Sequence, residues 1–404
     1  MDDLLFLAHR IPYPPRKGDK IRSYHLLRLL SQRYRVHLGA FVDDANDLPH
    51  ATTLARMCGG ETRFIRLHPL LARVRALQGL LTGSSLTLPY YNHRAMGQWT
   101  RDLLRRHPIT RIVVYSAAPA QFVLHDVNPA IRRVIDFVDV DSLKWDQYAS
   151  GRRGLSRWIY RREARTLLAD EKRIAAAFDA ALFVSEPEAN LFKTLAPETS
   201  GKIDFWENGV DVDFFSPHGN HENPFDQGDR PLVFTGAMDY WANVDAVTWF
   251  ATTVFPTVLA QIPRARFVIV GGRPAREVLA LQRMPGITVT GKVPDVRPFI
   301  AWSKAAVAPM RIAQGIQNKV LEAMAMARPV LATPKAMEGI RIPDPMLRWV
   351  GDEAQTLATL AIDLLNGADE DGSQPPCGPL GREHVLTHHN WSITLEKAAA
   401  LVAG

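Results

Sequence analysis

Short runs of Val, Ile, Leu and Phe recur along the whole chain, and a longer amphipathic stretch separates each run from the next. Strands that are buried on both faces of a parallel sheet read as such apolar runs, and the stretches between them are typical of the helices that cover the sheet. The runs form two series. The first covers residues 4–8, 36–41, 112–115, 134–137 and 181–184, and the second covers residues 232–235, 267–270, 287–290 and 305–308. We therefore predict an α/β protein with two doubly wound, Rossmann-like domains.

A loop-like segment separates the two series. Residues 208–231 are rich in Asn, Asp, Gly and Pro and show no sustained hydrophobic period, which is typical of a linker. We therefore divide the chain into a first domain at 1–207 and a second at 208–387, both of ordinary domain size. A second loop-like stretch at 367–379 precedes residues 388–404, which we predict to form a terminal helix that joins the first domain.

Charge is divided unevenly between the two halves of the chain. Residues 1–204 hold 31 Lys and Arg against 21 Asp and Glu, whereas residues 205–404 hold 17 against 21. This asymmetry indicates that the first domain meets a negatively charged partner, such as an anionic membrane or a phosphorylated lipid. Nucleic acid is a poor candidate, because the sequence has no zinc finger, RNP-type aromatic motif or basic repeat.

Cysteine usage and the start of the chain argue against a secreted or membrane-spanning protein. Cys58 and Cys377 lie far apart and form no metal-ligand spacing or disulfide framework, which suits a reducing compartment. The chain starts with acidic residues and a short apolar run, without a basic leader or a cleavage-like site. No stretch of about 18 apolar residues occurs, so we predict a cytoplasmic location and no transmembrane helix.

Ligands of open α/β sheets bind beyond the carboxyl ends of the strands, where helix N-termini offer free amide groups to anions. Two strand-to-helix junctions have suitable residues but give weak signals. After residues 4–8, a loop with prolines and cations leads to Gly18, where the backbone can approach a phosphate; an ordinary surface turn fits equally well. A glycine pair precedes Arg273 after residues 267–270, where glycine is also common for conformational reasons alone.

A third junction, at residues 309–325, carries the strongest signal. A loop with Gly315 leads into a helix whose first turns contain Asn318 and Lys319, so that amide groups and one cation can bind a diphosphate together. Glu322 lies one turn further along and can accept hydrogen bonds from a ribose diol, with a solvated helix glutamate as the alternative. The sequence has no GxGxxG, GxxxxGK[ST], GxSxG or HExxH motif, which removes the main support for dehydrogenases, P-loop kinases, α/β-hydrolases and zinc peptidases.

The sequence NKVLEAMAMARPVLAT at this junction resembles the signature of glycosyltransferase family 4, whose members are retaining enzymes of the GT-B fold. Three more segments are similar to elements of that family in the same order: WENGVD, FTGAMDYWANVD and TGKVPDV. Three others resemble a bacterial subgroup of sugar transferases linked to exopolysaccharide and PEP-CTERM/exosortase loci: HRIPYPPRKGDKIRSYHLL, IDFVDVDSLKW and FVSEPEA. The resemblance covers nearly the whole chain and implies two Rossmann-like domains that face each other across a cleft.

The resemblance implies retaining transfer from a nucleoside-diphosphate sugar, with the donor in the second domain, the acceptor in the first, and no metal or other cofactor. Glu322 matches the second glutamate of the family's E-x7-E pair and would hold the donor ribose. Val293 belongs to the turn that would contact the base. The donor-binding residues implied are Gly18, Gly236, Arg273, Val293, Arg311, Gly315, Ile316, Gln317, Asn318 and Glu322.

Two positions on the donor side depart from the family pattern. Gln314 replaces the first glutamate of the E-x7-E pair, and an amide can bond sugar hydroxyls but cannot offer negative charge to a cationic transition state. Segment 236–244 lacks the Arg/Lys pair with which many relatives grip the diphosphate. We assign that role to Lys319, Arg311 or Arg273.

The residue that would activate the acceptor is left open by the sequence. Residues 116–119 lack the histidine that some relatives have at this place. Asp139 and Asp141 are candidates to position or deprotonate an acceptor hydroxyl, with capping of the next helix as the alternative. Together with Lys319 and Gln314, they are the catalytic candidates.

Two segments of the first half have the character of membrane-facing helices. One is a leucine-rich stripe flanked by arginines, and the other, at 152–165, is a cationic run with Trp158 and Tyr160. Each also fits a helix that packs on the core with a solvated outer face. With the charge asymmetry, they indicate peripheral binding at the inner face of the cytoplasmic membrane, next to a polyprenyl-diphosphate-linked acceptor. The stripe consists of Leu70, Leu71, Val74, Leu77, Leu80 and Leu81.

The sequence therefore predicts a retaining glycosyltransferase that moves a sugar to a lipid-linked or glycan acceptor in exopolysaccharide or cell-surface glycan synthesis. Two alternatives stay open. One is a nucleotide-sugar epimerase or hydrolase on the same scaffold. The other, suggested by Gln314, is a catalytically weakened subunit that binds nucleotide sugar and scaffolds an assembly complex.

Overall fold

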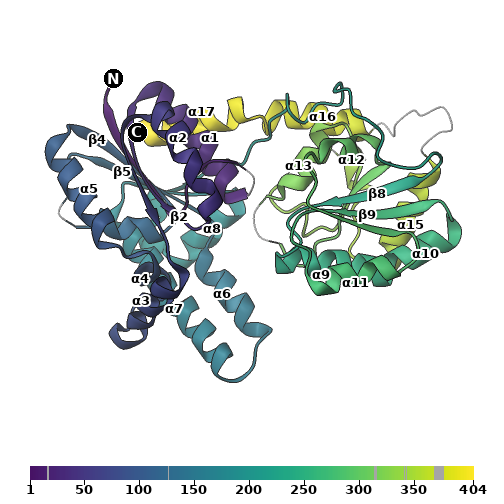
Figure 1. Cartoon of the computed structure of the whole chain (residues 1–404), viewed down its shortest axis with the longest axis horizontal. Coiled ribbons are helices and arrows are strands. Elements are labelled where there is room, and N and C mark those ends of the chain that lie inside the picture. The colour runs from purple at the N-terminus through teal and green to yellow at the C-terminus, as the bar shows by residue number, and fades with distance from the viewer. Residues whose placement is uncertain (16–17, 126, 314–315, 341, 343, 368–376) are drawn as a thin grey trace. The chain divides into compact units, whose positions relative to one another are not determined.

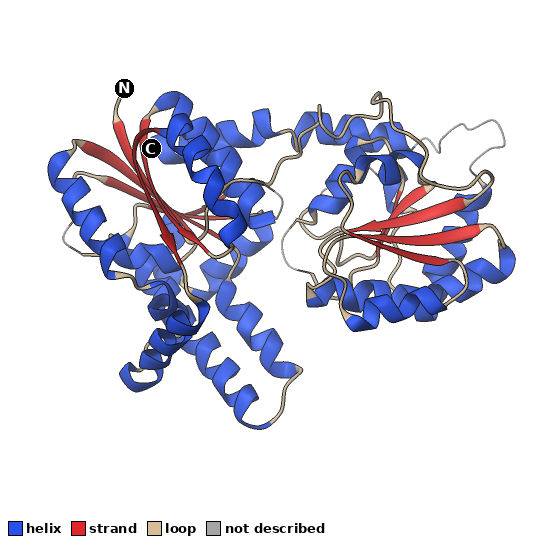
Figure 2. Cartoon of the chain, in the orientation of Figure 1, coloured by secondary structure: helices blue, strands red, loops and turns tan. Residues whose placement is uncertain are grey.

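The computed structural model describes residues 1–15, 18–125, 127–313, 316–340, 342, 344–367 and 377–404. They form two compact units, each built on one parallel sheet with helices around it (Figure 1, Figure 2). The first unit comprises Met1–Glu207 and Leu395–Gly404, and the second comprises Asn208–Thr394. The α/β class with two parallel sheets that the apolar runs predict is confirmed.

The first unit has a seven-stranded sheet in the order β3-β2-β1-β4-β5-β6-β7. Its strands are β1 (Asp3–Ala8), β2 (Arg35–Val42), β3 (Gly59–Arg66), β4 (Ile109–Tyr115), β5 (Arg132–Val138), β6 (Ala180–Phe183) and β7 (Ile203–Phe205). Its α-helices are α1 (Gly18–Arg33), α2 (Ala51–Cys58), α3 (Pro69–Thr82), α4 (Thr87–Tyr91), α5 (Arg94–Arg106), α6 (Asp141–Ser150), α7 (Gly154–Ala177) and α8 (Glu186–Leu195).

The second unit has a five-stranded sheet in the order β10-β9-β8-β11-β12. Its strands are β8 (Arg230–Thr235), β9 (Ala265–Val270), β10 (Ile287–Gly291), β11 (Ala305–Ala308) and β12 (Val330–Ala332). Its helices are α9 (Trp241–Trp249), α10 (Phe255–Gln261), α11 (Arg276–Ala280), α12 (Arg297–Trp302), α13 (Asn318–Ala325), α14 (Asp344–Leu347), α15 (Ala354–Asn366) and α16 (Cys377–His388), and α17 (Trp391–Ala403) begins in this unit and ends in the first.

Three strands lie outside the predicted series, and all three are at a sheet edge. β3 has the sequence GGETRFIR, in which only Ile65 is buried, and β7 and β12 have three residues each. A strand at the edge of a sheet pairs on one side only and is commonly short or polar. Such a strand gives a run that is too short or too polar to be recognised from the sequence.

The chain segment that opens the second unit is held by the segment before α17. The backbone N–H of Val210 donates to the His389 carbonyl at 2.7 Å, and a Cβ atom at Gly209 would lie 2.7 Å from the indole of Trp391. Of the loop expected at 367–379, residues 368–376 lie outside the described residues, and α16 begins at Cys377. Within residues 388–404, where a terminal helix is expected, α17 covers Trp391–Ala403, and His388 is the last residue of α16.

Candidate functional site

Two glycines bring the backbone of the second unit's sheet together at the carboxyl ends of its central strands. Gly236 follows β8, and its N–H donates to the Val270 carbonyl at 3.0 Å. Gly271 follows β9, and a Cβ atom there would lie only 1.7 Å from the carbonyl oxygen of Gly236. Gly236 itself has φ of 156°. Glycine is therefore required at this edge, because the two turns pack backbone against backbone with no room for a Cβ atom.

The ammonium group of Lys319, the second residue of α13, lies at this edge. Its Nζ donates to Asn243 Oδ1 at 2.6 Å and lies 4.0 Å above the centre of the Phe234 ring. Asn243 in turn donates from Nδ2 to the Ala237 carbonyl at 2.9 Å, which fixes its amide with the oxygen toward the lysine. A Cβ atom at Gly236 would come within 3.5 Å of Nζ. Segment 236–244 has no cation of its own, and Lys319 of α13 places one beside it.

Burial makes the ammonium form of Lys319 less stable than it is in water. Burial lowers the pKa of Lys319 to about 7, against the opposing effect of Glu322. Burial also raises the pKa of Glu322 to about 7, opposed by Lys319. A dianionic ligand at the edge would favour the ammonium form, because an opposite charge nearby stabilises the charged state.

The first turn of α13 adds amide groups to the same edge. Gln317 precedes the helix in an extended conformation, and its side chain makes no capping bond within the described structure. Asn318 accepts a hydrogen bond on Oδ1 from Asn208 Nδ2 at 3.2 Å, and Ile316 is buried in the core. The N–H of Val320 donates to the Gln317 carbonyl at 2.9 Å, and the positive end of the helix dipole at this N-terminus favours an anion. Gln314 and Gly315 lie outside the described residues.

The two other predicted cations of the second unit are paired with carboxylates. Arg273 Nε lies 3.1 Å from Asp239 Oδ2, and both side chains are exposed. Arg311 makes a bidentate ion pair with Asp245 on α9. Lys319 instead donates to the neutral amide of Asn243. Of these three cations, Lys319 is therefore the one whose hydrogen-bond partner among the described residues is neutral.

The remaining predicted donor residues have other positions. Val293 is partly buried and packs against Val233, Val268 and Val270, which are residues of β8 and β9. Gly18 is the first residue of α1 and is exposed in the first unit. Neither observation places a ligand on these residues, and their donor roles stay predictions.

Asp139 and Asp141 lie beyond the carboxyl end of β5 in the first unit. Lys144 Nζ bridges them, at 2.7 Å from Asp139 Oδ2 and 2.8 Å from Asp141 Oδ1. Although burial acts in the opposite direction, the two carboxylates raise the pKa of Lys144 well above its usual value. The first turn of α6 is bonded by Glu171, which accepts from Ser142 N and Oγ at 3.2 and 2.6 Å. The carboxyl groups bonded to the backbone at the start of α6 are therefore those of Glu171 and Glu188, whereas Asp139 and Asp141 pair with Lys144.

Sequence reasoning missed Asn243 and Lys144 as site residues. Asn243 stands in a segment already matched to the family, but its partner Lys319 is 76 positions away. Lys144 lies three residues after Asp141, a spacing that brings side chains together on a helix, and this spacing could have been read from the sequence.

The part of the chain that contains this edge matches a known protein family by sequence. Residues 229–366, which lie within the second unit, match a family model described as "Glycosyl transferases group 1". The chain is a glycosyltransferase. This enzyme's resemblance to family 4 is thereby supported at the level of a group 1 domain, and its assignment to the PEP-CTERM subgroup stays a prediction. No curated protein matches the chain by sequence.

Solved structures share the enzyme's fold over its whole length. Anabaena HepE, crystallised with UDP and glucose, has a TM-score of 0.65 and 13% identity and covers 100% of both chains. WaaG, described as a glycosyltransferase of lipopolysaccharide biosynthesis, has a TM-score of 0.65 and 15% identity over 99% of this chain and 100% of its own. TarM has a TM-score of 0.65 and 10% identity over 100% of both chains. At these identities the likeness shows the fold alone, which is GT-B.

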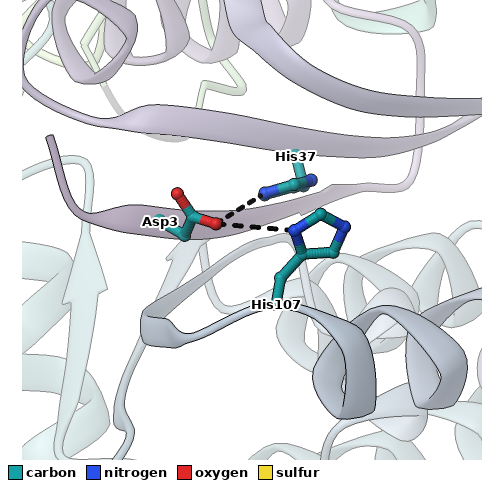
Figure 3. Close-up of side chains that lie close together, drawn as sticks. All are labelled: Asp3, His37 and His107. Carbon is teal, nitrogen blue, oxygen red and sulfur yellow. Dashed lines mark hydrogen bonds and ion pairs between the residues drawn. The ribbon is translucent and has the colours of Figure 1, made fainter.

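Asp3, His37 and His107 gather at the start of β1 in the first unit (Figure 3). His37 Nε2 lies 3.3 Å from Asp3 Oδ2, and His107 Nδ1 lies 3.7 Å from the same oxygen. The Glu61 N–H donates to His37 Nδ1 at 3.0 Å, so a neutral His37 carries its proton on Nε2 and donates to Asp3. Since Arg35 also pairs with Asp3 and lowers its pKa, we assign these residues to a structural ion-pair network.

Proposed function

We propose that this enzyme transfers a sugar, with retention of anomeric configuration, from a nucleoside-diphosphate sugar to a lipid-linked or glycan acceptor in exopolysaccharide or cell-surface glycan synthesis. The observation that carries the donor side is the Lys319 ammonium, bonded to Asn243 at the glycine-lined edge of the second sheet. Anabaena HepE has also been crystallised with UDP-glucose, which makes UDP-sugars the first donors to test.

On the donor side, the chemistry proposed is electrostatic. As the bond from the sugar to the diphosphate breaks, negative charge grows on the leaving phosphate. Lys319 and the first-turn amides of α13 would stabilise that charge, and such preorganised groups contribute most where charge develops in the transition state. Glu322, half-buried one turn along α13, would accept hydrogen bonds from the ribose.

On the acceptor side, we propose that Asp139 and Asp141 bind and orient the attacking hydroxyl. Each carboxylate has one oxygen bonded to Lys144 Nζ, and each has a second oxygen that can accept a hydrogen bond. Lys144 Nζ bonds to both carboxylates and holds them close together, so that one acceptor hydroxyl can be bound by either of them or pass its proton to one of them.

The test begins with donor binding. Thermal unfolding is measured with UDP-, GDP-, ADP- and dTDP-sugars, and a true donor at 100 times its Kd should stabilise the protein by about 2.7 kcal/mol. The stabilising donor is then used in transfer assays with lipid-linked acceptors, followed by NMR of the product's anomeric centre. Absence of both stabilisation and transfer across the panel would refute the proposal. Donor hydrolysis without transfer would favour the hydrolase alternative, and binding without turnover would favour the scaffold alternative.

We also propose that the first unit binds an anionic membrane surface through helices α3 and α7. Several apolar side chains on them face solvent rather than the core. Arg162 of α7 donates to the carbonyls of Gly79 and Ser84, so the two helices lie together. The exposed fractions are 75% for Leu70, 62% for Leu71, 63% for Val74, 57% for Leu77, 72% for Leu155 and 54% for Trp158. Exposed arginines flank them at 66, 73, 152, 153 and 157.

This membrane proposal is tested by pelleting with vesicles. No described helix is long and apolar enough to cross a bilayer, so binding would be peripheral. We expect the wild type to pellet with anionic but not with neutral vesicles. A Leu70→Ser, Val74→Ser, Leu77→Ser variant should lose at least about tenfold in partitioning, since each buried side chain of this size contributes about 1.5–3 kcal/mol. Leu279→Ser, exposed on the second unit, is the matched control. Equal pelleting of both variants would contradict the proposal.

A further inference from the structure

The strands β4 and β5 both end in residues with left-handed backbone. Val138, the last residue of β5, has φ of 73°, and Ser116, directly after β4, has φ of 72°. A β-branched residue in this region is a steric outlier that persists only where its surroundings hold it. The register between β5 and β6 also shifts between Asp136 and Val138. The chain is thus redirected at the point where it enters the segment with Asp139 and Asp141.

The carboxylate of Asp136 holds Val138 in this conformation. Asp136 Oδ1 accepts the N–H of Val138 at 3.1 Å, and the Asp136 carbonyl accepts the N–H of Ser116 at 2.8 Å. The Val138 carbonyl in turn accepts the N–H of Val184 at 2.7 Å. Both left-handed residues are therefore bonded to the same buried aspartate.

Arg22 and Trp206 fix the aspartate itself. Arg22 donates from Nε to Asp136 Oδ2 at 2.9 Å and from Nη2 to Oδ1 at 3.2 Å, and its side chain is fully buried. Trp206 donates from Nε1 to Asp136 Oδ2 at 3.0 Å, and the Arg22 guanidinium lies 3.5 Å from its ring centre. A bidentate pair with stacking is a rigid arrangement, because both planar groups are oriented as well as bound.

The segment after Val138 is bonded at several further points. The N–H of Val140 donates to Glu188 Oε2 at 3.0 Å, and Glu171 holds Ser142. Lys144 joins the two aspartates of the segment. These bonds hold the segment in the position to which the turn at Val138 leads.

We propose that Asp136 is a positioning residue for the acceptor, acting through Val138 to orient Asp139 and Asp141; this rests on the acceptor role proposed for those two aspartates. Asp136 is buried, so its proposed effect on the acceptor is indirect. Without its carboxylate, Val138 relaxes to an extended conformation and turns the following segment. A displacement of about 1 Å in a positioning group can cost about a hundredfold in rate.

The experiment first removes the clamp, which consists of the Asp136 carboxylate and its partners Arg22 and Trp206. It then removes the backbone strain at Val138. Asp136→Asn weakens the clamp, and the Arg22→Met, Asp136→Leu double variant deletes it without leaving a buried charge unpaired, so that folding is preserved if the single variant fails. Each is combined with Val138→Gly, because glycine takes a φ near +73° without steric cost. The readouts are kcat and KM for the acceptor, acceptor-free donor hydrolysis, and hydrogen exchange of residues 138–142.

We expect the clamp variants to lose at least about tenfold in kcat/KM for the acceptor, by the misplacement argument above, with donor hydrolysis within about twofold of wild type. Hydrogen exchange at 138–142 should speed up. Val138→Gly should restore a large part of both the transfer rate and the protection. Wild-type transfer by a folded clamp variant, or a loss that Val138→Gly does not restore, would overturn the inference. If the wild type itself neither binds donor nor transfers, the proposed function fails, whereas hydrogen exchange still reports on the clamp.

Discussion

Replacing Lys319 by methionine tests the donor site most directly. The change keeps an unbranched apolar side chain of nearly the same length, and it removes the ammonium group, its charge and its contact with the Phe234 ring. An ammonium about 4 Å from a phosphate oxygen contributes about 4 kcal/mol at an effective dielectric constant of about 20. That energy corresponds to about a thousandfold in rate, and loss of one charge-stabilising donor commonly costs about 10² to 10³ in kcat. We therefore expect kcat to fall by about 10² to 10³.

The fold should tolerate this change. Lys319→Met leaves Asn243 Oδ1 without its donor, which costs about 1–3 kcal/mol for a buried acceptor. It also removes a cation whose pKa burial has lowered, and this loss of a desolvated charge opposes the cost. We expect the free energy of unfolding, measured in urea, to stay within about 2 kcal/mol of wild type.

The pH dependence of donor binding gives a second, independent readout. Lys319 with a pKa of about 7 is largely neutral above that pH, and a bound diphosphate favours its ammonium form. Donor binding must then take up a proton, so the wild-type affinity should fall as pH rises above about 7, by up to about tenfold per pH unit. Calorimetry in two buffers of different ionisation enthalpy measures the proton uptake. Glu322→Gln separates the contribution of the second titrating group, and Lys319→Met should abolish the slope.

Two results would refute this reasoning. One is a Lys319→Met enzyme that turns over within about threefold of wild type, which is far below the effect expected for a lost transition-state charge. The other is an unchanged pH slope for donor affinity in that variant. Lys335→Met removes an exposed cation of the same unit that pairs with Glu338, and it serves as the matched control with unchanged turnover.

Three further outcomes follow from the contacts. Gly271→Ala forces a Cβ to within 1.7 Å of a backbone oxygen and should cost at least about 2 kcal/mol in urea unfolding, whereas Gly272→Ala, whose nearest contact is 3.5 Å, should stay within about 0.5 kcal/mol; equal losses would contradict the packing. Asn243→Asp places a carboxylate on Lys319 that competes with the diphosphate, so donor Kd from calorimetry should rise at least about tenfold, and an unchanged Kd would refute the contact. Burial raises the pKa of Glu171 from 4.5 to about 8, so the folded state binds this proton more tightly than the unfolded state does, and the stability that it contributes is lost as pH rises through that range. The Glu171→Gln variant should therefore gain stability relative to wild type between pH 5 and 9. A constant difference in stability would argue against the shift.

The leucine stripe of α3 shows a limit of pattern reading. A stripe at helical spacing predicts one apolar face, but the same stripe suits a face turned to the core and a face turned to solvent. Among the described residues of this helix, Ala72, Ala76 and Gly79 are buried, and Leu70, Leu71 and Val74 are exposed. The pattern was therefore sufficient to predict the helix, but it could not predict which of its side chains are buried.

The aspartates after β5 show the same limit for chemistry. Their place beyond a buried strand follows from the sequence, because parallel strands direct their carboxyl ends to one edge. That Glu171 bonds to the turn of α6, leaving Asp139 and Asp141 to Lys144, depends on a helix that begins after the pair and packs back against it. Spacing alone could not show which carboxyl group bonds to the turn and which ones pair with Lys144.

The sequence by itself determined the two parallel sheets and the helix that carries Lys319, because burial on both faces and helix periodicity are written in local residue order. Only the tertiary structure decided which side chains meet at the strand ends. Asn243 and Lys319 are 76 positions apart, and Arg22 and Asp136 are 114 apart. The physical reason is that hydrophobic periodicity specifies which face of an element is buried, whereas the contact between two polar groups depends on how separate elements pack.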